Sequence, residues 1–303
     1  MGRILTTDDG RWTIDDERRL PEPGPTGDTA TAILCGNFRR TARLSSLVPR
    51  LSSVVTLLAV LAFAGCGEPV RYPQIVDSPR PLTSTLPPQY RIAGASVEGR
   101  PMLYVALGQG PDVTFILGTI HGNEPAGTVL VRRLTRHLEQ NRELLTGRTV
   151  VLLPVANPDG LVYGKRQNAH DVDLNRNFIA ANRRGDVQGG PDALSEPEAK
   201  AIYQLIQQYS PDRIVSLHQP LACIDYDGPG QQLANHIAQF CDLPVKKLGA
   251  MPGSLGSYAG VTLGIPIITF EMQAEDSDLD TESLWRKYGN ALLAAITYPN
   301  RPE

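Results

Sequence analysis

Two residue types that bind metal ions stand three positions apart in the segment Thr119-Ile120-His121-Gly122-Asn123-Glu124-Pro125. An apolar run over residues 113–117 precedes this segment and is typical of a buried strand. An imidazole and a carboxylate on the turn that leaves a strand could bind one metal ion. Zinc accepts both ligand types, and a catalytic zinc has three protein ligands and an open position. The rest of the chain must therefore supply a third ligand, a base and groups that hold a substrate.

His218 and Glu271 are the candidates for the third ligand and the base, because each follows an apolar run that predicts a strand. Ligands of open α/β sheets bind in the crevice outside the carboxyl ends of the strands. We therefore predict a zinc site formed by His121, Glu124 and His218. Glu271 would be the general base that takes a proton from water and passes it to the leaving amine.

The segment from residue 164 to residue 178 is dense in polar residues and has neither helical nor strand periodicity. One interpretation is a solvated surface loop. The other is a substrate-binding loop, because Arg166, Asn175 and Arg176 could form a carboxylate-binding fork and an oxyanion donor. An exopeptidase needs both functions.

Strand and helix patterns alternate from Tyr90 onward, which indicates one α/β domain. The expected strands are residues 100–107, 113–118, 149–155, 213–217 and 265–270. The expected helices are residues 127–139, 231–241 and 281–297, and a further helix that a capping box at residues 195–198 opens and that runs to about residue 209. A turn is expected at residues 157–160. The predicted fold is a three-layer α/β/α sandwich with a mostly parallel mixed sheet.

The composition is that of an ordinary globular protein. The chain has 303 residues, a net charge of −3 and 41% hydrophobic residues, enough for one sizeable core. A net charge this close to zero does not indicate nucleic-acid binding. The 4 cysteines are scattered and form no disulfide framework, although Cys223 and Cys241 could pair in an oxidising compartment.

The N-terminal region resembles an export signal. Residues 1–38 are polar and without periodicity, so we expect disorder or an upstream extension. Four arginines then precede the apolar residues 51–64, and Cys66 directly follows Ala64-Gly65. This order resembles a bacterial lipoprotein processing site. The alternative is a single membrane anchor, but the run is shorter than the roughly 18 apolar residues a spanning helix needs.

These patterns divide the chain into three parts. We expect residues 1–66 to comprise the disordered N-terminus and the signal peptide, with cleavage before Cys66. Residues 67–88 contain six prolines and predict a stiff tether. Residues 89–303 would form the catalytic domain. We expect an exported protein of the cell envelope, attached to the membrane by a lipid on Cys66.

Four segments together look like the zinc carboxypeptidase family of the M14 type. They are His121-Gly122-Asn123-Glu124, Asp173-Leu174-Asn175-Arg176-Asn177-Phe178, His218 and Phe270-Glu271. The resemblance covers about residues 90–298. Residues 157–160, 216–225 and 253–257 further resemble the bacterial murein tripeptide amidase branch, whose members cut the amide bond between γ-D-glutamate and meso-diaminopimelate.

The resemblance implies catalytic roles position by position. His121, Glu124 and His218 match the ligands of one Zn²⁺ ion. Glu271 matches the general base, and Arg166 matches the arginine that stabilises the tetrahedral oxyanion. The implied activity is that of a zinc metallocarboxypeptidase or murein peptide amidase acting on a murein peptide substrate.

The resemblance also implies substrate-binding roles. Asn175 and Arg176 match the pair that grips the terminal carboxylate of the substrate. Asp225 lies in the motif of the murein branch, and we assign it to the distal ammonium of diaminopimelate or, alternatively, to capping of a loop. Digestive carboxypeptidases carry a mobile tyrosine before the base, but the spacing of Tyr258 does not match it.

Two other functions compete with the murein amidase. One is a deacylase of N-acylated amino acids, a related group that also uses His-Gly-Asn-Glu and an Asn-Arg pair. The segment around His218 argues against it. The other is a non-catalytic envelope lipoprotein that binds wall peptides. That function would require a damaged metal site, whereas all three ligands and the base are present.

Overall fold

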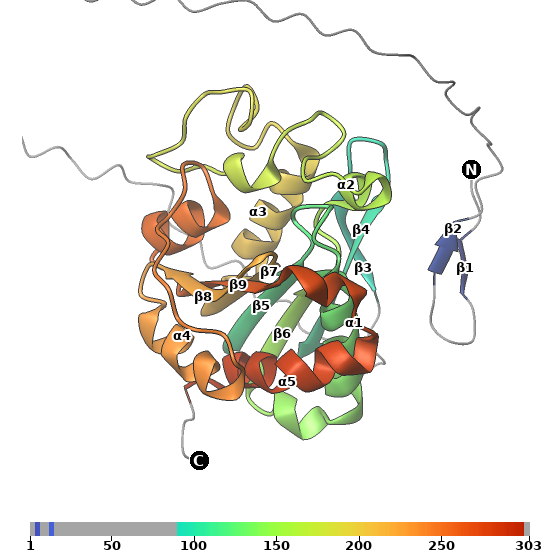
Figure 1. Cartoon of the computed structure of the whole chain (residues 1–303), viewed down its shortest axis with the longest axis vertical. Helices are drawn as coiled ribbons and strands as arrows, with labels where there is room; N and C mark the ends of the chain where they lie inside the picture. Colours follow the sequence, from blue (N-terminus) through green and yellow to red (C-terminus); the bar gives the residue numbers. More distant parts are fainter. Residues whose placement is uncertain (1–3, 7–11, 15–89, 300–303) are drawn as a thin grey trace, which may run out of the picture. The chain divides into compact units, whose positions relative to one another are not determined.

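The computed structural model describes residues 4–6, 12–14 and 90–299 (Figure 1). The two short N-terminal segments, β1 (Ile4–Thr6) and β2 (Trp12–Ile14), pair as an antiparallel ladder that the sequence does not predict. The expected signal peptide, Cys66 and the proline-rich tether lie outside the described residues. The remaining description concerns residues 90–299.

A seven-stranded mixed sheet forms the centre of this unit, with the strand order β3-β4-β6-β5-β7-β9-β8. The strands are β3 (Arg91–Ala95), β4 (Pro101–Gly108), β5 (Asp112–Gly118), β6 (Arg148–Leu153), β7 (Arg213–His218), β8 (Leu221–Asp227) and β9 (Ile267–Gln273). The four central strands β6, β5, β7 and β9 run parallel, and the outer strands pair antiparallel with their neighbours. The carboxyl ends of the parallel strands therefore meet at one edge of the sheet.

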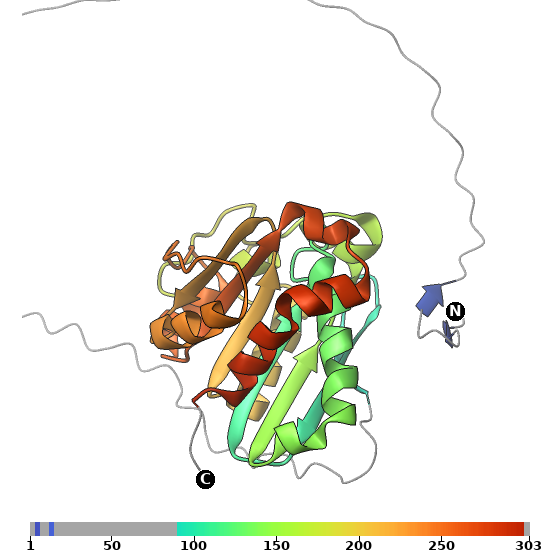
Figure 2. The same ribbon diagram turned by 60° about the horizontal axis from the view of Figure 1, so that its bottom comes forward.

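Helices cover both faces of the sheet, which gives the predicted three-layer arrangement. The helices are α1 (Ala126–Gln140), α2 (Pro158–Tyr163), α3 (Pro197–Tyr209), α4 (Gln231–Ile237) and α5 (Thr281–Thr297). Figure 2 shows α1 and α5 side by side against one face, where α4 also contributes to the core. The other core lies between the opposite face and α3, together with the π-helical turn η4 (Gly256–Thr262).

The five expected strands and four expected helices are present, with shifted boundaries. The sequence prediction missed the two edge strands, β3 and β8. The helix expected over residues 231–241 divides into α4 and the 3₁₀ turn η3 (Ala238–Phe240). Among the described residues, no helix has the length and apolar character to cross a membrane.

Two local predictions are wrong. The segment expected to be a turn at residues 157–160 begins α2: Asn157 is its N-cap and accepts a hydrogen bond from Gly160 N at 2.9 Å. The capping box expected at Ser195 does not form, because Glu196 is the N-cap of α3 and the Ser195 hydroxyl donates to the Glu196 carboxylate.

Candidate active site

The turn between β5 and α1 is held in an unusual backbone conformation by buried hydrogen bonds. Thr119 has φ = 54°, which is rare for a β-branched residue and persists only where the surroundings fix it. Its Oγ1 donates to the Glu124 carbonyl oxygen at 3.1 Å and lies 2.7 Å from Thr128 Oγ1. The chain therefore reverses direction within a few residues, and His121 and Glu124 both turn toward the sheet edge.

Glycine at position 122 allows this turn to pack against α2. A Cβ atom at Gly122 would lie 1.9 Å from the carbonyl carbon of Gly160. Gly122 N also donates to the Arg166 carbonyl oxygen at 3.4 Å. The glycine in the His-Gly-Asn-Glu segment is thus required by the close approach of two backbones.

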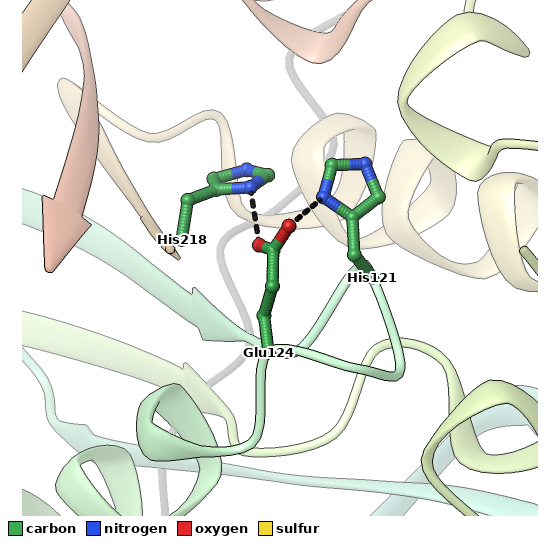
Figure 3. A group of neighbouring side chains, drawn as sticks. All are labelled: His121, Glu124 and His218. Atoms are coloured by element: carbon green, nitrogen blue, oxygen red, sulfur yellow. Dashed lines mark hydrogen bonds and ion pairs between the residues drawn. The ribbon is translucent and has the colours of Figure 1, made fainter. Parts of the chain in front are cut away.

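The side chains of His121, Glu124 and His218 converge at the carboxyl edge of the sheet (Figure 3). His121 Nδ1 lies 2.8 Å from Glu124 Oε1, and His218 Nδ1 lies 3.0 Å from Glu124 Oε2. One ligand atom from each residue lies within 4.8 Å of the other two, and all three residues are buried. Two imidazole nitrogens and one carboxylate oxygen at this separation form a donor set that suits zinc.

Asp173 fixes the ring of His121 from the other side. Its Oδ1 lies 3.1 Å from His121 Nε2, and it accepts a hydrogen bond from Asn175 N at 2.9 Å. A proton on Nε2 donated to Asp173 leaves the lone pair of Nδ1 free for a metal. Carboxylates in this position orient metal-binding histidines and raise their basicity. The surroundings of the three ligands therefore also fit a zinc site.

The charges of the site favour ionised carboxylates next to the histidines. Burial raises the pKa of Glu124, but hydrogen bonds from His121 and His218 outweigh it and lower the pKa to about 2. Burial lowers the pKa of His121, but hydrogen bonds with Asp173 and Glu124 raise it above its ordinary value. The pKa of Asp173 is lowered as well: its hydrogen bond with His121 overcomes the effect of burial.

Glu271 lies beside His218, since these two residues are register partners of β9 and β7. It is within β9, two residues before the strand ends, and not just beyond a strand as the sequence suggests. Its Oε2 accepts a hydrogen bond from Leu221 N at 3.3 Å. Burial raises the pKa of this carboxyl group, with an opposing effect from His218. A carboxylate with a raised pKa is suited to accept and return a proton.

A pocket of about 340 Å³ opens over these residues. The structure brings all eight of the predicted catalytic, substrate-binding and metal-binding residues into its lining: His121, Glu124, Arg166, Asn175, Arg176, His218, Asp225 and Glu271. Arg166 donates from Nη1 to Glu124 Oε1 at 3.2 Å and from Nε to Asp173 Oδ2 at 3.0 Å. The guanidinium group is thereby held at the mouth of the site.

Asn175 and Arg176 present free donors to the pocket. Asn175 Oδ1 accepts from Leu255 N at 2.8 Å, which fixes the amide and leaves its Nδ2 without a partner among the described residues. Arg176 Nη1 donates to the Asn175 carbonyl oxygen at 2.6 Å, and its guanidinium pairs with no described carboxylate. Burial lowers the pKa of Arg176; the charge of Asp173 opposes this effect, and the charge of the neighbouring Arg166 adds to it. An anion at this point would relieve the repulsion.

Tyr258 has no place in the pocket. It is 3% exposed, stacks against Phe178 and accepts a hydrogen bond from Gln207 Nε2 at 2.9 Å. The tyrosine is therefore a core residue, in agreement with its poor match to the mobile tyrosine of digestive carboxypeptidases. Cys223 and Cys241, which the sequence leaves able to pair, are both free.

Two residues of the site were missed from the sequence. Asp173 stands in the quoted Asp-Leu-Asn-Arg segment without an assigned role, and its carboxylate could have been proposed as a partner of a ligand histidine. Gln219 N donates to Glu124 Oε2 at 3.2 Å, and Gln219 Oε1 accepts from Ala126 N at 3.3 Å. No sequence pattern points to this bridge between β7 and α1.

The fold and the site define a class of hydrolase with a His-Glu-His metal centre at the carboxyl edge of a mixed sheet. The M14 sequence family, described as zinc carboxypeptidase, matches residues 85–234. Murein peptide amidase A of Escherichia coli K12 is 34% identical over 236 residues, which cover 72% of this chain and 95% of that protein. The chain belongs to the zinc carboxypeptidase family and is a peptide hydrolase.

Two further comparisons extend this result. Murein peptide amidase A of Vibrio campbellii is 30% identical over 224 residues, covering 68% of this chain and 86% of that protein. The crystal structure of the murein-tripeptide amidase MpaA from Escherichia coli O157 matches with a TM-score of 0.57 and 28% identity, over 74% of this chain and 98% of that one. Carboxypeptidase A from Helicoverpa armigera shares the fold, with a TM-score of 0.59 and 19% identity over 71% of this chain and 70% of that one.

Proposed function

We propose that this protein hydrolyses the amide bond between γ-D-glutamate and meso-diaminopimelate in murein peptides, with one zinc ion held by His121, Glu124 and His218. The observation that carries the proposal is the continuity of one pocket. It extends from the three metal-binding side chains to the free donors of Asn175 and Arg176 and to the carboxylate of Asp225. The similarity to murein peptide amidases supports the choice of substrate.

The reaction needs groups that move a proton and stabilise negative charge. Bound zinc would supply Lewis-acid activation of water and of the scissile carbonyl. Glu271 accepts a proton from the attacking water and returns it to the amine that leaves. The guanidinium of Arg166 stabilises the oxyanion of the tetrahedral intermediate. Asp173 holds His121 in the orientation that metal binding requires.

The substrate is positioned by its charges. The terminal carboxylate of the peptide binds the guanidinium of Arg176 and the amide of Asn175, both of which lack other anionic partners among the described residues. The side chain of diaminopimelate then points toward Asp225, which is 5% exposed and forms no ion pair with any described residue. Its carboxylate would bind the distal ammonium.

The test is a substrate panel with the purified zinc-loaded protein. We expect release of free diaminopimelate from L-Ala-γ-D-Glu-meso-diaminopimelate, measured by mass spectrometry of the products. N-acetyl-aspartate and N-succinyl-glutamate are the comparison substrates, and we expect no turnover of either. Deacylation of these two without cleavage of the tripeptide would assign the site to the related deacylases.

We further propose that the protein is exported and attached to a membrane of the cell envelope by a lipid on Cys66. The support is the order of arginines, apolar residues and Ala64-Gly65-Cys66 in the sequence. In that compartment the enzyme would act on released murein peptides or on the wall.

A further inference from the structure

Two carboxylates of β8 lie side by side on the wall of the pocket. Asp225 and Asp227 flank Tyr226 along the strand, so both side chains point to the pocket face. The rise per residue of a strand places their Cα atoms about 7 Å apart. They are 5% and 4% exposed. Two buried carboxylates in one pocket repel each other unless at least one is neutralised.

The structure neutralises only one of them. Lys247 Nζ lies 2.9 Å from Asp227 Oδ1, donates to the Tyr226 carbonyl oxygen and lies 4.5 Å from the centre of the Tyr226 ring. Asp225 accepts a hydrogen bond from Leu248 N at 2.8 Å and pairs with no cation among the described residues. The pocket wall therefore carries one paired and one unpaired carboxylate.

Asp227 has no room to turn away from this pair. A Cβ atom at Gly256 would lie 2.1 Å from Asp227 Oδ2, and one at Gly260 would lie 2.6 Å from Asp227 Cβ. Two glycines of η4 thus enclose the aspartate. Its charge must be balanced where it stands, and Lys247 is the cation that does so.

The neutralisation of Asp227 by Lys247 affects how the pocket can bind the side chain of diaminopimelate. That side chain carries its ammonium at the same distance from the main chain as lysine does, but it adds a carboxylate on the same carbon. Asp225 attracts the ammonium of either side chain. Discrimination between the two must come from groups that tolerate or repel the additional carboxylate.

We propose that Lys247 determines this specificity by neutralising Asp227, so that the pocket accepts a side chain ending in both an ammonium and a carboxylate. The inference rests on the proposed murein amidase function and deepens it. Lys247 is half-exposed and does not line the pocket, so it acts through Asp227 as a positioning residue. Without it, two negative charges would face the substrate, and lysine would become the favoured side chain.

The charges around Asp225 agree with this arrangement. Burial raises the pKa of Asp225, the hydrogen bond from Leu248 N lowers it, and Asp227 raises it further. Lys247 opposes that effect. The negative charge of Asp227 thus disfavours ionisation of Asp225, and the positive charge of Lys247 favours it.

The test measures the affinities of two tripeptides, L-Ala-γ-D-Glu-meso-diaminopimelate and L-Ala-γ-D-Glu-L-Lys, by calorimetry. All proteins carry Glu271→Gln, so that the peptides are not consumed. With Lys247 present we expect diaminopimelate to be preferred. Lys247→Gln should shift the ratio of the two dissociation constants roughly tenfold toward the lysine peptide, because one unscreened charge is exposed to the substrate.

Three further variants separate the charge effect from a structural one. Lys247→Arg should keep the preference for diaminopimelate. Lys246→Gln removes the neighbouring positive charge, which forms no ion pair with the described residues, and should leave the ratio unchanged. Asp227→Asn should restore the preference when combined with Lys247→Gln, since no second carboxylate then remains.

The result that overturns the inference is an unchanged ratio in Lys247→Gln, or an equal shift in Lys246→Gln. Failure of both tripeptides to bind would overturn it as well. The proposed function is tested separately, by release of diaminopimelate by the protein with Glu271 intact. A shifted ratio without such release would sustain the specificity inference and reject the proposed reaction.

Discussion

Glu271 is buried beside His218 but bonds to neither the histidines nor Glu124, which leaves its carboxylate available for proton transfer. We predict that Glu271→Gln retains zinc and loses about 10²- to 10⁴-fold in kcat, because the amide keeps the shape and cannot accept the proton. The measurement is turnover of the tripeptide together with the zinc content per chain.

Glu275→Gln is the matched control for this variant. Glu275 is exposed in the 3₁₀ turn η5 (Ala274–Asp278), four positions further on and outside the pocket lining. The same chemical change there should leave turnover unaltered. A wild-type rate in Glu271→Gln would remove Glu271 from the mechanism.

The metal-binding residues and the general base could be predicted from the sequence. His121, Glu124, His218 and Glu271 stand at or near strand ends, and the structure brings them together. The ion pair of Asp227 with Lys247 could not be predicted from the sequence, because the two residues are 20 positions apart. It depends on how the chain returns along the edge of the sheet.

At the scale of elements, the turn between β5 and α1 positions His121 and Glu124, and its packing against α2 holds it in place. We predict that Gly122→Ala destabilises the protein by about 1–3 kcal/mol and reduces its zinc content. The new methyl group would meet the backbone of Gly160, so the turn or α2 must shift. Thermal unfolding and metal analysis measure both effects.

Gly185→Ala provides the control for this substitution. A Cβ atom at Gly185 would meet nothing within 4 Å. We expect neither stability nor zinc content to change. If Gly122→Ala behaved in the same way, the close packing of the two backbones would not be needed for the site.

Two of the elements that the sequence did not reveal, β8 and α2, were missed for different physical reasons. In β8 the alternate positions Ala222, Ile224 and Tyr226 face the core and Asp225 and Asp227 face the pocket, so the strand lacks the continuous apolar run that predicted the central strands. α2 begins with Asn157 and Pro158, which are residues of turns and also of helix starts. The long apolar strands and amphipathic helices, by contrast, were predictable because burial in the two cores fixes their periodicity.

At the scale of the whole molecule, the metal should also stabilise the fold, because its three ligands come from two separate parts of the chain. Zinc at 100 times its Kd would add about 2.7 kcal/mol to the free energy of unfolding. For a protein of this size that corresponds to roughly 5–10 °C in Tm. Calorimetry with and without a chelator measures the difference.

Restoring zinc after removal of the chelator should return the original Tm. The variant His121→Ala should show a low Tm that neither treatment changes. An identical Tm for the zinc-loaded and chelator-treated protein would contradict the proposed site.

The N-terminal region makes a prediction about the mature protein. If Cys66 is lipidated, mass spectrometry of protein from the native envelope should find Cys66 as the first residue, carrying acyl groups. Cys66→Ser should abolish the modification and release the protein from the membrane fraction. Residues upstream of Cys66 in the mature membrane-bound protein would contradict the lipoprotein proposal.

The most direct test of the central claim is release of free diaminopimelate from L-Ala-γ-D-Glu-meso-diaminopimelate, with and without a zinc chelator. The proposed function predicts rapid release that the chelator abolishes and added zinc restores. No release from the zinc-loaded protein, or release that the chelator leaves unchanged, would contradict it.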